Sequence, residues 1–240
     1  MTRALSPMSV ELLPAMPQFA AGDDVAQAIA VAARSARIPI GREDVVVIAQ
    51  KIVSKAEGRM RRLRDVTPGL QAREIAGATG RAPELLQLVL AEGAVMRAAP
   101  FAVITRHRTG HVTANSGIDA SNVVGGEDGM VLLWPENPDE SARSIRAGLE
   151  TELSSAPAVI IADSLGRAWR QGTLGTAIGC AGLNHTDDRR GQKDIFGRTL
   201  EATIVAVADA IAGFAVLAMG EGAEGTPVAV VRGAGRFVTT

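Results

Sequence analysis

The stretch AVIIADSLGRAWRQGTLGTAIG, residues 158–179, joins an apolar run to a charged, glycine-rich segment. Its opening AVIIA is short and continuous, which predicts a buried strand. Asp163 and Ser164 end this run, and Arg167 and Arg170 follow among glycines. A carboxylate, a hydroxyl and two guanidinium groups are suited to holding a metal ion and phosphate oxygens. A solvated surface loop carries the same residue types, so the rest of the chain has to decide between the two interpretations.

Composition limits the kind of protein. The 240 residues are 47% hydrophobic, enough for a sizeable core in one large domain or two intimate ones. A net charge of −1 and the absence of Tyr argue against a basic or stacking surface for nucleic acid. The single cysteine, Cys180, excludes an intrachain disulfide and a cysteine-rich zinc site, and its apolar neighbours predict a buried thiol rather than a nucleophile.

The N-terminus has no apolar signal-peptide core. The most apolar segment, residues 203–219, contains Asp209 and is short for a membrane span of about 20 residues. We therefore expect a cytoplasmic protein with neither a membrane nor a nucleic-acid partner.

Apolar periodicity and turn residues predict the other elements of the chain. A helix is expected to begin at Asp23-Asp24, after a loop at residues 16–22. Further helices are predicted at 69–79, 83–92, 137–153 and 201–219, and strands at 44–49, 100–105, 112–115, 130–133 and 226–231.

Polar segments follow several of these elements directly. Residues 50–58 come after a buried strand and carry Lys51 and Lys55. The two lysines suit phosphate contacts, but taken alone they favour a solvated strand end. Residues 115–123, with Asp119, are mostly short or polar and predict a loop that faces a ligand.

The segment GEGAEG, residues 220–225, matches the pattern G-x-G-x-x-G. A dinucleotide-binding fingerprint follows a strand and opens a helix, whereas this segment follows a predicted helix and precedes a strand. A Rossmann site is therefore excluded by context, and no P-loop motif is present. The glycines still permit close approach of a ligand, and Glu221 and Glu224 supply oxygen ligands.

Three of these segments place an acid beside glycines: Asp119, Asp163 and Glu221. If they converge, two carboxylates about 4 Å apart repel by roughly 4 kcal/mol at an effective dielectric constant near 20, and a cation removes that cost. Oxygen ligands without His or Cys favour Mg²⁺ or Mn²⁺ over zinc. With Lys51, Lys55 and the two arginines of the opening stretch, this set indicates phosphoryl transfer.

Other charged positions suit plain structural roles. His107 and His111 lie in a predicted hairpin turn and are expected to be exposed. The arginine run from Arg59 to Arg64 has no interleaved aromatics and predicts a solvated edge. The charged loop at residues 187–198 suits either an anionic substrate or solvent.

Five ordered motifs carry a resemblance to a known family. KIVSKAEGR, ANSGIDASNV, ADSLGRxWRxGxxGxAIG, GxKDxFGR and MGEGxEGxPVxVVRG occur in that order. Together they resemble the coenzyme F420-0:L-glutamate ligases, the F420 gamma-glutamyl ligase family, over residues 12–235.

The resemblance implies an activity. Members of this family use GTP to join L-glutamate to coenzyme F420-0 through an acyl phosphate, and then add further gamma-linked glutamates. It implies two divalent ions per site, Mg²⁺ or Mn²⁺, and a K⁺ ion. A metal-dependent phosphohydrolase or a nucleotide-binding module on the same fold are the alternatives.

The resemblance also implies an architecture. The expected fold is α+β, with mixed sheets and packed helices, in an intertwined homodimer whose active site lies near the interface. Residues 1–240 are expected to form a single domain, with room for two intimate subdomains. The C-terminal nitroreductase-like flavin domain of some homologues is not expected here.

Residue by residue, the resemblance implies the following site. The metal ligands would be Asp119, Asp163, Ser164 and Glu221, although Thr is common in the family where Ser164 stands. Arg167 and Arg170 would join the two aspartates in catalysis. The nucleotide contacts would be Met16, Pro17, Gln18, Phe19, Gln50, Lys51, Lys55, Asn122, Met219, Gly220, Glu221, Gly222, Ala223, Glu224, Gly225 and Thr226.

Overall fold

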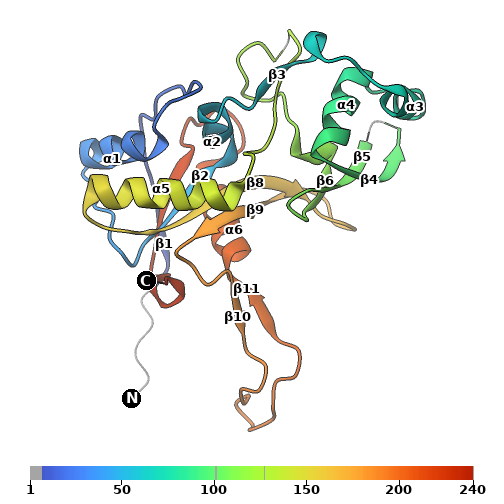
Figure 1. Cartoon of the computed structure of the whole chain (residues 1–240). Coiled ribbons are helices and arrows are strands. Elements are labelled where there is room, and N and C mark those ends of the chain that lie inside the picture. Colours follow the sequence, from blue (N-terminus) through green and yellow to red (C-terminus); the bar gives the residue numbers. More distant parts are fainter. Residues whose placement is uncertain (1–6, 101, 127, 240) are drawn as a thin grey trace.

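The computed structural model of the chain describes residues 7–100, 102–126 and 128–239 (Figure 1). Within these residues, the largest sheet has five strands in the order β1-β12-β2-β8-β9. The central pair β2 and β8 is parallel, and the other neighbours are antiparallel. The strands are β1 (Ser9–Leu12), β2 (Val45–Ala49), β8 (Ala158–Gly166), β9 (Thr173–Ala181) and β12 (Val228–Arg232).

Helices cover both faces of this sheet, because alternate side chains of its central strands point to opposite sides. Val46 packs with α1 (Val25–Ala36) and α5 (Pro138–Leu153), whereas its neighbour Val45 packs with α6 (Val207–Met219). Figure 1 shows α1 and α5 side by side on one face and α6 on the other. We call the sheet with these helices the main lobe.

A small lobe, residues 70–118, has an apolar centre of its own. Its helices pack near an antiparallel sheet in the order β4-β5-β6. The antiparallel pair of β3 and β7 lies on the two chain segments that run between the lobes. These elements are α3 (Leu70–Thr79), α4 (Pro83–Glu92), β4 (Gly93–Ala99), β5 (Ala102–His107), β6 (Val112–Ala114), β3 (Met60–Arg62) and β7 (Met130–Leu132).

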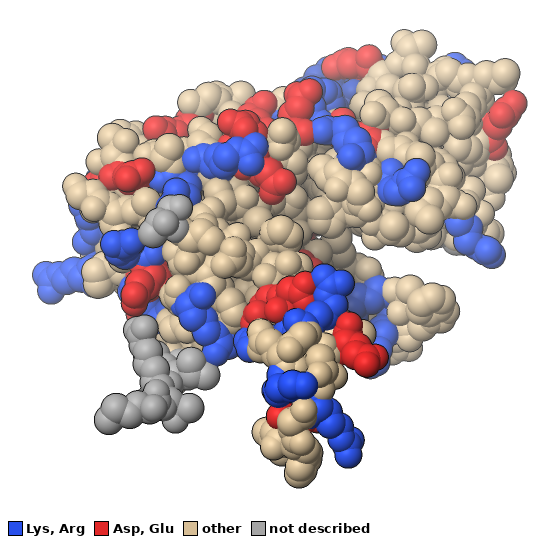
Figure 2. Space-filling view, turned by 60° about the horizontal axis from the view of Figure 1, so that its bottom comes forward, with Lys and Arg blue, Asp and Glu red and all other residues tan. Residues whose placement is uncertain are grey.

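An arm, residues 186–206, extends away from the main lobe (Figures 1 and 2). Its base is an antiparallel pair of β10 (Thr186–Asp188) and β11 (Ile204–Ala206). Figure 2 shows acidic and basic side chains along the arm. Ile195 and Phe196 beyond the base are 92% and 79% exposed, so the arm presents apolar side chains to its surroundings.

Most predicted elements are confirmed, including the helices at 69–79, 83–92 and 137–153 and the buried strand after Asp44. The mixed α and β composition is confirmed as well. No helix in the described ranges is both long and apolar enough to cross a membrane.

One predicted helix start is wrong. The helix expected from Glu201 begins at Val207, because residues 204–206 pair with β10 instead. The short helix α2 (Gln50–Ala56) was not predicted. The strands β1, β3, β4, β9, β10 and β11 were not predicted either.

The glycine-rich loop expected after Asp163 is shorter than predicted. β8 continues to Gly166 and β9 begins at Thr173, so Gly175 lies within a strand. A Cβ atom at Gly175 would lie 2.5 Å from the Cβ of Val216 on α6. This glycine therefore lets α6 pack closely against β9 and does not shape a ligand loop.

Candidate active site

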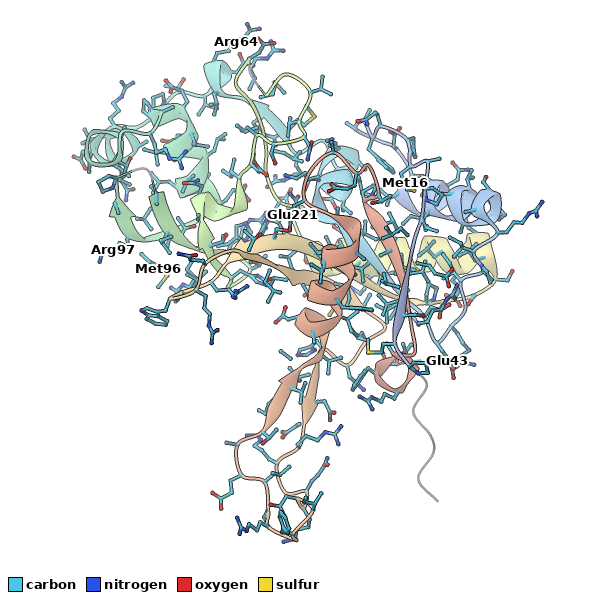
Figure 3. All side chains as sticks on the ribbon, turned by 180° about the vertical axis from the view of Figure 1, so that it is seen from behind. Met16, Glu43, Arg64, Met96, Arg97 and Glu221 are labelled. Atoms are coloured by element: carbon cyan, nitrogen blue, oxygen red, sulfur yellow. The ribbon has the colours of Figure 1, made fainter. Side chains whose placement is uncertain are left out.

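A cavity of about 1360 Å³ lies between the main and small lobes. The first turn of α2, the loop after β6, the end of β8 and the loop after α6 all contribute to its walls. Figure 3 shows Glu221 between the two lobes, whereas Glu43 and Arg64 lie at the edges of the molecule. Every residue that the sequence predicts for catalysis, metal binding or nucleotide binding lines this one cavity, although their individual roles stay predictions.

The aspartate of the loop after β6 is held by a lysine of α2. Lys51 Nζ donates to the Asp119 carboxylate and, at 3.0 Å, to Ser121 Oγ. Ser121 donates to the same carboxylate through its backbone N–H at 2.8 Å and its hydroxyl at 2.6 Å. Burial alone would raise the pKa of Asp119, but these hydrogen bonds and the charge of Lys51 lower it. Asp119 is therefore an anion at neutral pH.

The aspartate of β8 has a different environment. Trp134 Nε1 donates to Asp163 Oδ2 at a distance of 2.7 Å. Burial raises the pKa of Asp163, and the hydrogen bond from Trp134, a backbone N–H and the charge of Lys51 only partly oppose this effect. A desolvated carboxylate of this kind is stabilised by a cation in the cavity.

Hydrogen bonds connect the three cavity loops to one another. Ser164 Oγ donates to the Glu221 carboxylate, which joins β8 to the loop after α6. Asn122 Nδ2 donates to Gly222 O at 3.3 Å, and Lys55 Nζ donates to Asn122 O at 2.9 Å. Burial and the nearby charge of Lys51 lower the pKa of Lys55. An anionic ligand would offset both effects.

One buried donor in the cavity wall lacks a partner. Gln50 is 1% exposed, and its Oε1 accepts a hydrogen bond of 2.8 Å from Ser54 Oγ. Its Nε2 has no hydrogen-bond partner among the described residues. An unmade bond of this kind costs about 1–3 kcal/mol, which an acceptor oxygen of a ligand would recover.

The donor set fits a hard divalent cation in its chemistry, because the three carboxylates and one hydroxyl are all oxygen donors. Asp119, Asp163 and Glu221 line the same cavity, as expected, but their side chains do not form one shared coordination sphere. In the described part of the chain, no three His, Cys, Asp or Glu side chains lie close enough together to hold a metal ion. Each carboxylate instead accepts from a protein donor: Asp119 from Lys51, Asp163 from Trp134, and Glu221 from Ser164.

The two arginines of the opening stretch lie in the exposed loop between β8 and β9. Arg167 donates to Gln171 O at a distance of 3.3 Å. Neither Arg167 nor Arg170 forms an ion pair with a described acid. Both line the cavity and are free to meet an anion. From the N-terminal side, Met16 and the following loop residues complete the wall.

Three predictions about charged residues are wrong. His107 is buried, at 1% exposure, and His111 is half-buried rather than exposed. Arg59 is buried too, because it donates to Glu92 Oε1 and to the backbone carbonyl of Trp134, each at a distance of 2.8 Å.

Cys180 is half-buried. Burial raises the pKa of its thiol, which disfavours a nucleophilic thiolate.

A buried ion cluster therefore lies beside the cavity. Arg59 and Arg108 donate to the Glu92 carboxylate, and His107 Nε2 lies 3.4 Å from it. Burial alone would raise the pKa of Glu92, but His107 and the two guanidinium groups outweigh it and lower the pKa to about 2. Glu92 is thus a buried anion at neutral pH with three partners.

Gly117 allows Trp134 to reach Asp163. Gly117 has a φ of +70°, and a Cβ atom there would lie 2.3 Å from Cε2 of the indole. We expect Gly117→Ala to lower the free energy of unfolding by at least about 3 kcal/mol, since it adds a steric clash to backbone strain. Urea unfolding measures this loss.

Gly110→Ala is the matched control for that substitution. Gly110 has a φ of +93°, and nothing lies within 4 Å of a Cβ atom built there. It should lose only about 1 kcal/mol, from backbone strain alone. Equal losses in the two variants would contradict a tight fit of the indole against Gly117.

The sequence did not single out Ser121 or Trp134. Ser121 lies in the loop predicted to face a ligand, so its short polar side chain carried a usable signal. Trp134 follows an apolar strand and precedes a proline, a setting typical of an ordinary core residue. Its contact with Asp163 joins residues 29 positions apart and depends on the packing of the two lobes.

Comparison with known proteins identifies the family. Residues 15–233 match the family model described as F420-0:Gamma-glutamyl ligase. The chain is 42% identical over 219 residues to the coenzyme F420:L-glutamate ligase of Methanothermobacter thermautotrophicus, covering 91% of this chain and 86% of that protein. It is 43% identical over 229 residues to the enzyme of the same name from Archaeoglobus fulgidus, covering 94% and 88%. The chain therefore belongs to the F420-0:gamma-glutamyl ligase family.

Proposed function

We propose that this chain is a coenzyme F420-0:L-glutamate ligase that acts in coenzyme F420 biosynthesis. It uses GTP to join L-glutamate to the carboxylate of the lactyl-phosphate side chain and then adds further gamma-linked glutamates. Membership of the family supports this activity. The observation that carries it is the single cavity of about 1360 Å³ that all the predicted site residues line. A typical small-molecule site has roughly 300–1,000 Å³, so this cavity has room for more than one substrate.

The proposed reaction has two balanced steps. In the first, a carboxylate oxygen of the acceptor attacks the γ-phosphorus of GTP, the bond to the bridging oxygen breaks, and GDP leaves. In the second, the amine of glutamate attacks the acyl carbon of the resulting acyl phosphate. An amide bond forms, inorganic phosphate leaves, and the amine loses a proton.

We assign a binding role to each group of cavity residues from its chemistry. Lys51 and Lys55 bring positive charge to the polyphosphate, and the unpaired Nε2 of Gln50 donates to a ligand oxygen. Arg167 and Arg170, which line the cavity, would bind the phosphate and carboxylate groups of the acceptor. The glycines of residues 220–225 let backbone groups approach the nucleotide.

The metal part of the proposal assigns two divalent cations, Mg²⁺ or Mn²⁺, to Asp119, Asp163, Ser164 and Glu221, with a K⁺ ion nearby. A divalent cation bound there neutralises charge on the transferring phosphoryl group. The oxygen-only donor set and the desolvation of Asp163 support this assignment.

We further propose a homodimer, in which the arm contacts a second copy of the chain. Its exposed Ile195 and Phe196, at 92% and 79%, support this assembly, since large apolar side chains are seldom exposed together without a partner. The molar mass in solution, measured by sedimentation, tests the dimer independently of the activity.

Transfer of an isotope label tests the acyl phosphate. With ¹⁸O in the acceptor carboxylate, we expect one labelled oxygen to appear in inorganic phosphate for each amide formed. Phosphate that is released without glutamate and carries oxygen from water would contradict the proposal and indicate a phosphohydrolase.

A further inference from the structure

Trp134 links the cavity to the buried ion cluster of the small lobe. Its side chain is completely buried, and its Nε1 donates to Asp163 Oδ2 at 2.7 Å. Its backbone carbonyl accepts a hydrogen bond of 2.8 Å from Arg59 Nε, and Arg59 in turn binds Glu92. The backbone of Trp134 is therefore connected through Arg59 to Glu92 of the small lobe, while its indole reaches Asp163 of the main sheet.

The indole has little freedom to turn. The ring of His107 lies at a centroid distance of 4.8 Å with a tilt of 56°, and the ring of His111 lies at a centroid distance of 5.6 Å and an angle of 86°. Gly117 leaves the space that the Nε1 edge of the indole fills. Packing on these sides sets the direction of the N–H bond before any ligand enters the cavity.

The two aspartates of the cavity are held in contrasting ways. Asp119 bonds to the ammonium group of Lys51, which neutralises its charge. Asp163 bonds to an indole N–H, which only donates and carries no charge at any ordinary pH. The indole therefore orients Asp163 and leaves its negative charge available to a cation.

We propose that Trp134 is a positioning residue for Asp163, fixing one carboxylate oxygen so that the side chain meets a divalent cation in a set orientation. This inference rests on the metal site of the proposed function. In other proteins, removing a group that hydrogen-bonds to a metal ligand typically lowers metal affinity roughly 10–100-fold. We expect the loss of the Trp134 N–H to lower the metal affinity of this site by the same factor.

The test compares two tryptophan substitutions, since the chain has two tryptophans. Trp134→Phe keeps most of the ring volume and removes the N–H donor. We expect its affinity for Mn²⁺, titrated by electron paramagnetic resonance on the full-length protein, to fall about 10–100-fold. Trp169→Phe is the control: Trp169 is fully exposed and forms no described contact with Asp163, so its Mn²⁺ affinity should stay at the wild-type value.

A double-mutant cycle separates positioning from a loss of packing. If Trp134 acts through Asp163, then Trp134→Phe has no further effect on Mn²⁺ binding in the Asp163→Ala background, which has no side-chain oxygen for the indole to hold. Equal losses in both backgrounds would overturn the proposal, as would wild-type affinity in Trp134→Phe. Wild-type protein that binds no Mn²⁺ would overturn both this inference and the metal site on which it rests.

Fluorescence supplies a readout that keeps the indole in place. In Trp169→Phe, Trp134 is the remaining indole, and Mn²⁺ bound at Asp163 should quench its emission because the ion is paramagnetic. Bound Mn²⁺ that leaves this emission unchanged would overturn the contact between the indole and the metal ligand. These outcomes do not depend on ligase activity, so Mn²⁺ binding with the expected losses but without product would count against the proposed reaction alone.

Discussion

Asp163→Asn is expected to lower the kcat for glutamate ligation by at least about 1,000-fold, because the transferring phosphoryl group loses the charge that a correctly held cation supplies. The substitution is nearly isosteric, and the amide oxygen still accepts from Trp134 Nε1, so the thermal midpoint should change little. Steady-state kinetics with varied GTP and metal concentrations measure the effect.

Asp65→Asn is the control for this substitution. The Asp65 side chain is 71% exposed and lies near Arg64 on the surface, away from the cavity. Its kcat should match that of the wild-type protein. A kcat for Asp163→Asn within about tenfold of the wild type, with folded protein, would show that the cavity does not use this carboxylate in phosphoryl transfer.

Glu92→Gln is expected to lower the free energy of unfolding at pH 7 by roughly 3–5 kcal/mol, because it leaves buried guanidinium charge without its counter-ion. Arg59 and Arg108 both donate to this carboxylate. Glu136→Gln is the matched control, since Glu136 is 80% exposed and lies 3.7 Å from the same Arg59. That variant should lose no more than about 1 kcal/mol.

The effect of Glu92 has a defined pH dependence. Its pKa falls from 4.5 to about 2 in the folded protein, so the folded state favours the ionised form. The stabilisation is complete above pH 4.5 and is lost as the pH falls towards 2. Urea unfolding at a series of pH values should therefore show the gap between wild type and Glu92→Gln closing across that window. A gap that is constant with pH would contradict the assignment.

The elements of the main lobe could be predicted because their signals are local. The run after Asp44 is continuously apolar, and Asn137 with the following proline opens an amphipathic helix. The helix start at Glu201 was wrong for the opposite reason. Residues 204–206 fit the helical pattern, but pairing with β10 takes precedence over local periodicity.

The cavity residues could be predicted from motifs, whereas two of their supports could not. The motifs name Asp119, Asp163 and the donor Lys51, but they do not single out Ser121 and Trp134, which also donate to these carboxylates. The sequence predicts solvated positions for His107 and Arg59, but both are buried because they pair with Glu92 of α4. The burial of these charged side chains depends on packing between elements that are distant in the sequence, and a short sequence pattern does not show such packing.

Mass spectrometry of the product tests the central claim most directly. The full-length protein would be incubated with coenzyme F420-0, L-glutamate, GTP and Mn²⁺, with each component omitted in turn. We expect a product heavier by one glutamyl residue and one GDP for each amide bond, and neither when glutamate or GTP is omitted. Folded protein that releases phosphate from GTP but leaves coenzyme F420-0 unchanged in mass would contradict the account.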